Sequence, residues 1–252
     1  MAQSSNSRQI GNTDAERSAR RRPAMYTAGS RAVVLGAGMS GLLSARVLSD
    51  FYESVTVLER DQLPDQPRHR KGVPQGRHLH QFLTRGTQVL GELFPGILDE
   101  LVDAGAVIND PSRIYTRFGR YELSSTGTLA DPQALRYYQA SRPFMEFHVR
   151  RRVGALGNVT FLDGHQVVDL VTTADAVTGV RTTNCDTGVA TILDADLVVD
   201  ATGRASRTPD FLQRRAGRPI TVVDPCLSIP IGLTGSQSGC GVDMCRDTIR
   251  CM

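Results

Sequence analysis

The sequence contains no tryptophan, a single lysine (Lys71) and no long uninterrupted apolar run. A transmembrane helix needs about 18 or more consecutive apolar residues, so no stretch predicts one. Residues 1–30 are polar and lack the apolar centre of a signal peptide, so we expect a disordered tail there and a cytoplasmic protein. No Tyr-x-x-x-Lys pair can be built around Lys71, which argues against a short-chain dehydrogenase.

Metal and nucleic-acid binding are also poorly supported. The spacing of the five cysteines does not match C-x-x-C zinc sites, and no histidine follows His165 to complete a ligand set. The odd cysteine count argues against a disulfide framework, so we expect reduced thiols. A net charge of +3, carried mostly by scattered arginines, is too small to indicate a nucleic-acid partner.

The most informative stretch is a G-x-G-x-x-G motif formed by Gly36, Gly38 and Gly41. It follows an apolar run at Val33–Leu35, expected as a parallel strand, and opens a helical pattern over Met39–Asp50. The first glycine permits a tight turn, the second a close approach to a pyrophosphate, and the third close helix–strand packing. The pyrophosphate would sit on the positive end of the helix dipole.

The context of the motif separates it from a plain glycine turn. A second predicted strand, Val55–Leu58, ends at Glu59, about 20 residues beyond the glycines. A carboxylate at this position accepts hydrogen bonds from the adenosine ribose. The alternative is a plain turn followed by a surface glutamate, and the order of the elements favours the dinucleotide. The sequence therefore predicts a dinucleotide with a free ribose 2′-OH.

A long polar loop over Asp61–Gln81 is rich in basic side chains. It is either a solvated loop or a segment that lies over the cofactor, where positive groups can face phosphates. His78 and His80 would share one face of a strand, but without a third ligand nearby we expect no metal site.

Downstream, helical periodicity predicts helices over Phe82–Phe94 and Ile97–Ala104, with β character around Ile114–Leu123. A third helix is expected to begin at Ser141, as N-cap, with Arg142 and Pro143 in its first turn. Its apolar side is assigned to Phe144, Phe147 and Val153, and its solvated face to Arg150, Arg151 and Arg152.

The period then changes to that of strands. We expect an antiparallel meander of short strands at Val159–Leu162, Gln166–Thr172, Val177–Thr183 and Val189–Leu193. A continuous apolar strand, Leu197–Ala201, should return to the first sheet, because buried parallel strands are apolar on both faces.

With its four motifs in order, the chain resembles the FAD-dependent monooxygenase superfamily of the p-hydroxybenzoate hydroxylase type. These motifs are the glycine loop with Glu59, Gly72–His80, Ser141–Pro143 and Asp200–Arg204. The superfamily includes flavin-dependent halogenases and geranylgeranyl reductases, and the chain looks most like actinobacterial epoxidase-like FAD-binding oxidoreductases. The resemblance implies a Rossmann-like α/β fold, with an FAD-binding parallel sheet and an inserted antiparallel β-meander.

The resemblance also implies a set of cofactor-binding residues. The pyrophosphate would lie on Gly36, Gly38, Met39, Ser40 and Gly41, and the adenosine ribose on Glu59, followed by Arg60. Further contacts would come from Arg77 and His78 near the flavin, Arg142 near the phosphates, Val167 at the adenine through its backbone, and Asp200 and Gly203 beside the nucleotide. Two of these have plain alternatives: a surface arginine at a helix start for Arg142, and a strand-end residue satisfied by local N–H groups for Asp200.

The expected organisation is a tail at 1–30, an incomplete FAD/NAD(P)-binding domain at 31–212, and an atypical segment at 213–252. Four of the five cysteines lie in this last segment, which lacks clear periodicity. It is either the product of a reading-frame shift near Arg214–Arg218 or a genuine short variant with a disordered tail.

The expected function is an FAD-dependent oxidoreductase of monooxygenase or epoxidase type. It would use NADPH or NADH as reductant, together with oxygen, on a small organic substrate. The catalytic residues and the oligomeric state are not assigned. The alternatives are a reductase or halogenase of the same fold, the latter weakened by the absence of tryptophan. A third alternative is an inactive, truncated FAD-binding remnant with exposed sheet edges.

Overall fold

In the computed structural model the chain forms two compact units. The first unit comprises Met1–Arg77 and Arg142–Ser206, and the second His78–Ser141 and Arg207–Met252. The structure describes residues 28–77, 79–109, 116–118, 120–123 and 137–216. The predictions for residues 1–27 and 217–252, which include most of both expected tails, lie outside the described residues.

The first unit is built on a four-stranded parallel sheet with the order β12-β1-β2-β8. Its strands are β1 (Gly29–Leu35), β2 (Tyr52–Leu58), β8 (Val159–Leu162) and β12 (Leu197–Asp200). The central strands β1 and β2 extend further toward their N-terminal ends than their apolar runs alone predict. The return of β12 to β1 is confirmed, with Leu35 paired to Asp200.

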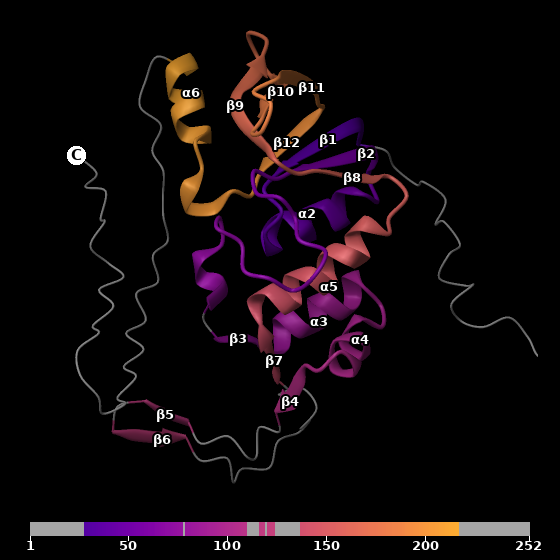
Figure 1. The fold of residues 1–252 in the computed structure, drawn as a ribbon, viewed down its shortest axis with the longest axis vertical. Helices are drawn as coiled ribbons and strands as arrows, with labels where there is room; N and C mark the ends of the chain where they lie inside the picture. Colours follow the sequence, from indigo (N-terminus) through magenta and orange to yellow (C-terminus); the bar gives the residue numbers. More distant parts are fainter. Residues whose placement is uncertain (1–27, 78, 110–115, 119, 124–136, 217–252) are drawn as a thin grey trace, which may run out of the picture. The chain divides into compact units, whose positions relative to one another are not determined.

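Two helices, α2 (Met39–Leu48) and α5 (Arg142–Gly154), pack against each other and against this sheet (Figure 1). The interior is aliphatic: Val34, Leu42 and Ala45 are fully buried, as is Val149 of α5. Fully burying a side chain of this size contributes about 1.5–3 kcal/mol. This burial keeps the glycine loop between β1 and α2 in a fixed place.

The antiparallel meander is a three-stranded sheet with the order β11-β10-β9. It comprises β9 (His165–Thr172), β10 (Val177–Asn184) and β11 (Ala190–Asp194). Its membership differs from the prediction, because the segment at Val159–Leu162 is β8 and pairs in parallel with β2. The connection through α5 explains this, because a helical crossover returns the chain in the direction of the earlier strand.

The side of α5 that is buried also differs from the prediction. Met145, Val149 and Val153, spaced four residues apart, are buried, whereas Phe144 and Phe147 are half-buried. Residues at this spacing lie on one face of a helix, so the aliphatic residues and not the two phenylalanines define the packed side. Of the three arginines expected in solvent, only Arg151 is exposed.

The second unit combines short strands and helices. A three-stranded antiparallel sheet has the order β3-β7-β4, with β3 (Leu79–Phe82), β7 (Tyr137–Ser141) and β4 (Val107–Asn109). The strands β3, β4 and β7 were not predicted. The expected helices are present as α3 (Thr84–Leu93) and α4 (Ile97–Asp103), and the expected β character as β5 (Thr116–Phe118) and β6 (Tyr121–Leu123). A further helix, α6, spans Thr208–Ala216.

Within the described ranges, no helix combines the length and apolarity needed to cross a bilayer.

Candidate cofactor site

The glycine loop between β1 and α2 lies at the carboxyl end of the parallel sheet. Gly36 has φ +96°, a region that L side chains rarely adopt, and its N–H donates to the carbonyl of Leu58 at 2.7 Å. A Cβ at Gly41 would lie 1.8 Å from the Gly36 carbonyl oxygen. Both positions therefore require glycine, for the turn and for the helix–strand contact respectively.

The N-terminus of α2 is open. Gly38 is the N-cap residue in extended conformation, with no side-chain hydrogen bond capping the helix and no acidic residue in the first turn. A Cβ at Gly38 would meet nothing nearer than Nη2 of Arg142, at 4.0 Å. The first N–H groups of a helix lack intrahelical partners and carry a positive partial charge. An anion therefore has both space and donors here, with Met39 half-buried and Ser40 exposed beside it.

Glu59, which follows β2, points its carboxylate back at this loop. Oε2 accepts the backbone N–H of Ala37 at 2.9 Å, and Oε1 accepts the N–H of Asp61 at 3.0 Å. Burial alone would raise the pKa of Glu59, but these N–H groups and the Arg70 guanidinium together hold it below its usual value. Glu59 is therefore an ionised acceptor fixed at the loop.

Two residues that the sequence analysis did not assign connect Glu59 to Arg142. Nη1 of Arg70 lies 3.0 Å from Oε2 of Glu59, and its Nη2 donates to Oε2 of Glu146 at 3.1 Å. Nε of Arg142 in turn donates to Oε1 of Glu146 at 2.6 Å. The i,i+4 spacing of Arg142 and Glu146 on a predicted helix could have revealed this second pair. Arg70 had no such signal, because it lies in an irregular loop with several basic neighbours.

The structure thus brings together five of the residues that the sequence analysis assigned to one cofactor: Gly36, Gly38, Gly41, Glu59 and Arg142. Arg142 is 19% exposed and oriented by Glu146, which differs from a free surface arginine. The arrangement fits a diphosphate at the start of α2 and a ribose near Glu59. The fit rests on the open space at Gly38 and the ionised carboxylate.

Other predicted residues are not joined to this cluster. The Arg60 guanidinium is half-exposed and lies 4.0 Å from Asp61, and Arg77 is exposed at the end of η1 (Pro74–Arg77). Val167 pairs with Thr182 within the meander. His78 lies outside the described residues. The cofactor roles of these four residues stay predictions.

Asp200 makes a local network at the end of β12. Its Oδ1 accepts the N–H and the hydroxyl of Thr202, and its Oδ2 accepts the hydroxyl of Ser206. Gly203, with φ +67°, begins the short helix η4 (Gly203–Ala205) within this turn. These bonds match the alternative in which Asp200 organises the strand end. A role beside the nucleotide stays a prediction.

Among the described residues, no group of three or more His, Cys, Asp and Glu side chains is arranged to hold a metal ion.

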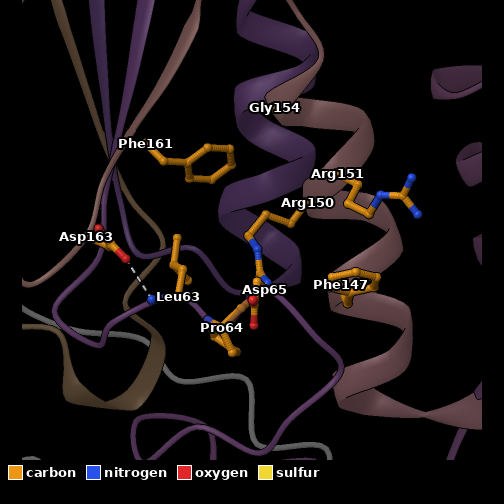
Figure 2. Close-up of a pocket in the computed structure, with 9 residues that line it drawn as sticks. All are labelled: Leu63, Pro64, Asp65, Phe147, Arg150, Arg151, Gly154, Phe161 and Asp163. Atoms are coloured by element: carbon orange, nitrogen blue, oxygen red, sulfur yellow. Dashed lines mark hydrogen bonds between the residues drawn. The ribbon is translucent and has the colours of Figure 1, made fainter.

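A groove of about 470 Å³ lies beside α5 and the end of β8 (Figure 2). Oδ2 of Asp163 accepts the N–H of Leu63 at 2.7 Å, and Arg150 reaches across to donate to the Pro64 carbonyl, whereas Arg151 points away. Burial and the nearby Arg70 charge lower the pKa of Arg150. These bonds fasten the loop after β2, and the groove is lined by Leu63, Pro64, Asp65, Phe147, Arg150, Arg151, Gly154, Phe161 and Asp163.

The fold is that of FAD-dependent halogenases and monooxygenases. The myxobacterial chondrochloren halogenase CndH, a variant of FAD-dependent halogenases, superposes with a TM-score of 0.55 at 24% identity, over 71% of this chain and 38% of that one. PqsL of Pseudomonas aeruginosa, a probable FAD-dependent monooxygenase, gives 0.53 at 17% identity, over 77% and 47%. The Diels-Alderase PyrE3 gives 0.53 at 22% identity, over 78% and 36%.

In sequence, the chain is 42% identical to protein Rv3254 of Mycobacterium tuberculosis over 194 residues. The match covers 72% of this chain and 39% of that protein, so the chain spans about two-fifths of this relative. No family model matches the chain.

Proposed function

We propose that this chain binds FAD through the glycine loop, Glu59 and Arg142, and that it forms the cofactor-binding part of an FAD-dependent oxidoreductase. The carrying observation is the pairing of an open helix N-terminus at Gly38 with an ionised carboxylate at Glu59. These two features match the two ends of an adenosine diphosphate group, and a carboxylate favours an unphosphorylated ribose 2′-OH.

Each residue has a separate task in this proposal. The first N–H groups of α2 and the Arg142 guanidinium would hold the pyrophosphate, since both present positive charge to the same space. Glu59 would accept hydrogen bonds from the ribose hydroxyls. When bound, FAD would supply the hydride and oxygen chemistry that side chains lack, while the protein orients the group and excludes water.

The reaction type is a proposal for the whole enzyme, of the monooxygenase or epoxidase type. NADPH or NADH would be the reductant and a small organic molecule the substrate. The likeness of the fold to FAD-dependent monooxygenases and halogenases supports this reading. The same fold also occurs in a Diels-Alderase, so an assay must decide the reaction.

The binding proposal is tested by titrating the chain with FAD and comparing it with Gly38→Asp. Gly38 has an extended backbone that any residue adopts, and aspartate is a favoured N-cap. The substitution should therefore preserve folding while it places negative charge in the pyrophosphate site, and FAD affinity should fall at least about tenfold. Equal affinities would contradict the assignment of this site.

The reaction is tested by adding NADPH or NADH to the FAD-loaded chain in air and following their absorbance at 340 nm. If the FAD-loaded chain oxidises NADPH or NADH faster than free FAD does, the result supports an oxidoreductase whose nicotinamide site lies in this chain. If the chain binds FAD but does not accelerate the oxidation of NADPH or of NADH, it binds the cofactor without this activity. That result would support the alternative of an inactive FAD-binding remnant.

A further inference from the structure

Four side chains of alternating charge form a continuous chain behind the glycine loop: Glu59, Arg70, Glu146 and Arg142. The inner pair, Arg70 and Glu146, is the more deeply buried, each side chain being 5% exposed. The outer two, Glu59 and Arg142, are 12% and 19% exposed and border the proposed ligand space. The buried pair therefore connects two groups that would contact opposite ends of the ligand.

Arg70 is also bonded to the loop itself. Its Nη2 donates to the carbonyl oxygen of Ala37 at 3.1 Å, while the backbone N–H of Ala37 donates to Oε2 of Glu59. A single guanidinium thus contacts the loop backbone and the carboxylates of Glu59 and Glu146. Because a guanidinium is planar and rigid, these contacts fix the relative positions of all three.

The contact between Arg70 and Glu59 differs from the others. Nη1 of Arg70 is buried and makes no hydrogen bond within the described part of the chain, although it lies 3.0 Å from Oε2 of Glu59. The contact is an ion pair, and the charge of Arg70 helps to hold the pKa of Glu59 below its usual value. Among the described residues Oε1 of Glu59 accepts only the N–H of Asp61, which leaves this oxygen able to accept from a ligand hydroxyl.

We propose that Arg70 is a positioning residue that couples Glu59 to Arg142 through Glu146, so that the ribose end and the phosphate end of the ligand are recognised as one unit. This inference rests on the proposed FAD site. Removing Arg70 would leave the carboxylates of Glu59 and Glu146 without their shared cation, a costly state for buried charges. Glu59 and Arg142 would then adjust to the ligand independently.

The test is a double-mutant cycle with FAD affinity as the readout, measured by quenching of flavin fluorescence. Glu59→Gln, Arg142→Met and their combination are compared in the presence of Arg70 and again with Arg70→Met. With Arg70 present, the combined loss should differ from the product of the single losses by at least about threefold. With Arg70→Met, the two effects should multiply.

Two further variants distinguish the positioning role of Arg70 from an effect of its charge alone and from a nonspecific effect of replacing an arginine in this loop. Arg70→Lys keeps the charge, but one ammonium group lacks the fork that reaches both carboxylates and the Ala37 carbonyl, so the coupling should again disappear. If Arg70→Met does not fold, the coupling is measured in Arg70→Lys alone. Arg68→Met is the matched control, since Arg68 is exposed and bonds only to Gln66 among the described residues. It should leave the coupling intact.

The outcomes are distinct. The inference is wrong if Glu59 and Arg142 show no coupling in the presence of Arg70, or if their coupling persists in both Arg70→Met and Arg70→Lys. Neither result would contradict the proposed FAD site. A purely structural role for Arg70 would lower affinity and stability without changing the coupling. If the unaltered folded chain binds no FAD, the proposed function and this inference fail together.

Discussion

The carboxylate of Glu59 accepts a hydrogen bond from the backbone N–H of Ala37 at 2.9 Å, which joins the end of β2 to the glycine loop after β1. Two segments 22 residues apart in sequence are thereby held at one edge of the sheet. The bond aligns the proposed ribose acceptor with the N–H donors at the start of α2. The proposed site is thus held in place by contacts within the chain itself.

Replacing this acceptor should weaken FAD binding strongly. In Glu59→Gln the side chain stays the same size, but it loses the negative charge that accepts from the loop and, in the proposed site, from the ribose. Hydrogen bonds to charged groups contribute about 1.5–3 kcal/mol, so the dissociation constant should rise about 10- to 100-fold. A flavin-fluorescence titration measures this. Glu53→Gln, at an exposed position on β2, is the control and should bind as the unaltered chain does.

Glu59 should also make stability depend on pH. Its pKa is lowered in the folded protein, so its ionisation contributes stability in full above the unfolded-state pKa, and this contribution disappears as the pH falls through the folded-state pKa. Urea unfolding should therefore show Glu59→Gln to be less stable than the unaltered chain at pH 7. The difference should shrink below about pH 4.3, the ordinary glutamate value. A difference that grows on acidification would contradict this assignment.

The first half of this site could be read from the sequence because its signals are local. Three glycines at fixed spacing, between an apolar strand and a helix, predict the loop at Gly36–Gly41 and the acid at Glu59. The structure confirms the β1–α2–β2 arrangement. The buried link through Arg70 and Glu146 could not be read in the same way, because their contact joins residues 76 positions apart.

Gly41→Ala tests the close contact between α2 and β1. Its Cβ would lie 1.8 Å from the Gly36 carbonyl oxygen, so the helix must move away from the strand. Overpacking of this kind costs about 1–3 kcal/mol or more in unfolding free energy. The control is Gly157→Ala, where a Cβ meets nothing within 4 Å. Chemical denaturation of both variants should show a large loss at Gly41 only; equal losses would contradict the packing described.

Arg150→Ala tests how the loop after β2 is fastened. This half-buried arginine donates to the Pro64 carbonyl, and its guanidinium lies 5.8 Å from the centre of the Phe147 ring, so its removal loses both contacts (Figure 2). We expect a loss of about 1–2 kcal/mol in unfolding free energy. Arg151→Ala, its exposed neighbour, should change stability by less than about 0.5 kcal/mol. Similar effects of the two substitutions would indicate that Arg150 is also solvated.

Tertiary context explains where sequence reasoning failed. Val159–Leu162 has the composition of a meander strand, yet the crossover through α5 makes it the parallel edge strand β8. Likewise, Phe144 and Phe147 are the larger apolar residues of α5, but the aliphatic set Met145, Val149 and Val153 is buried. Periodicity predicts whether a segment is a helix or a strand, but it does not predict which neighbouring element packs against each of its faces. Short strands such as β3 and β4 carry too few residues to show any period.

The central claim is that this chain holds FAD, and the most direct measurement is the visible spectrum of the purified chain after incubation with FAD and removal of free flavin. Denaturation then releases any bound cofactor for identification. We predict an oxidised-flavin spectrum with about one FAD per folded chain, and its loss in Gly38→Asp although that variant folds. A folded, monomeric chain that remains colourless and gains no flavin would contradict the account.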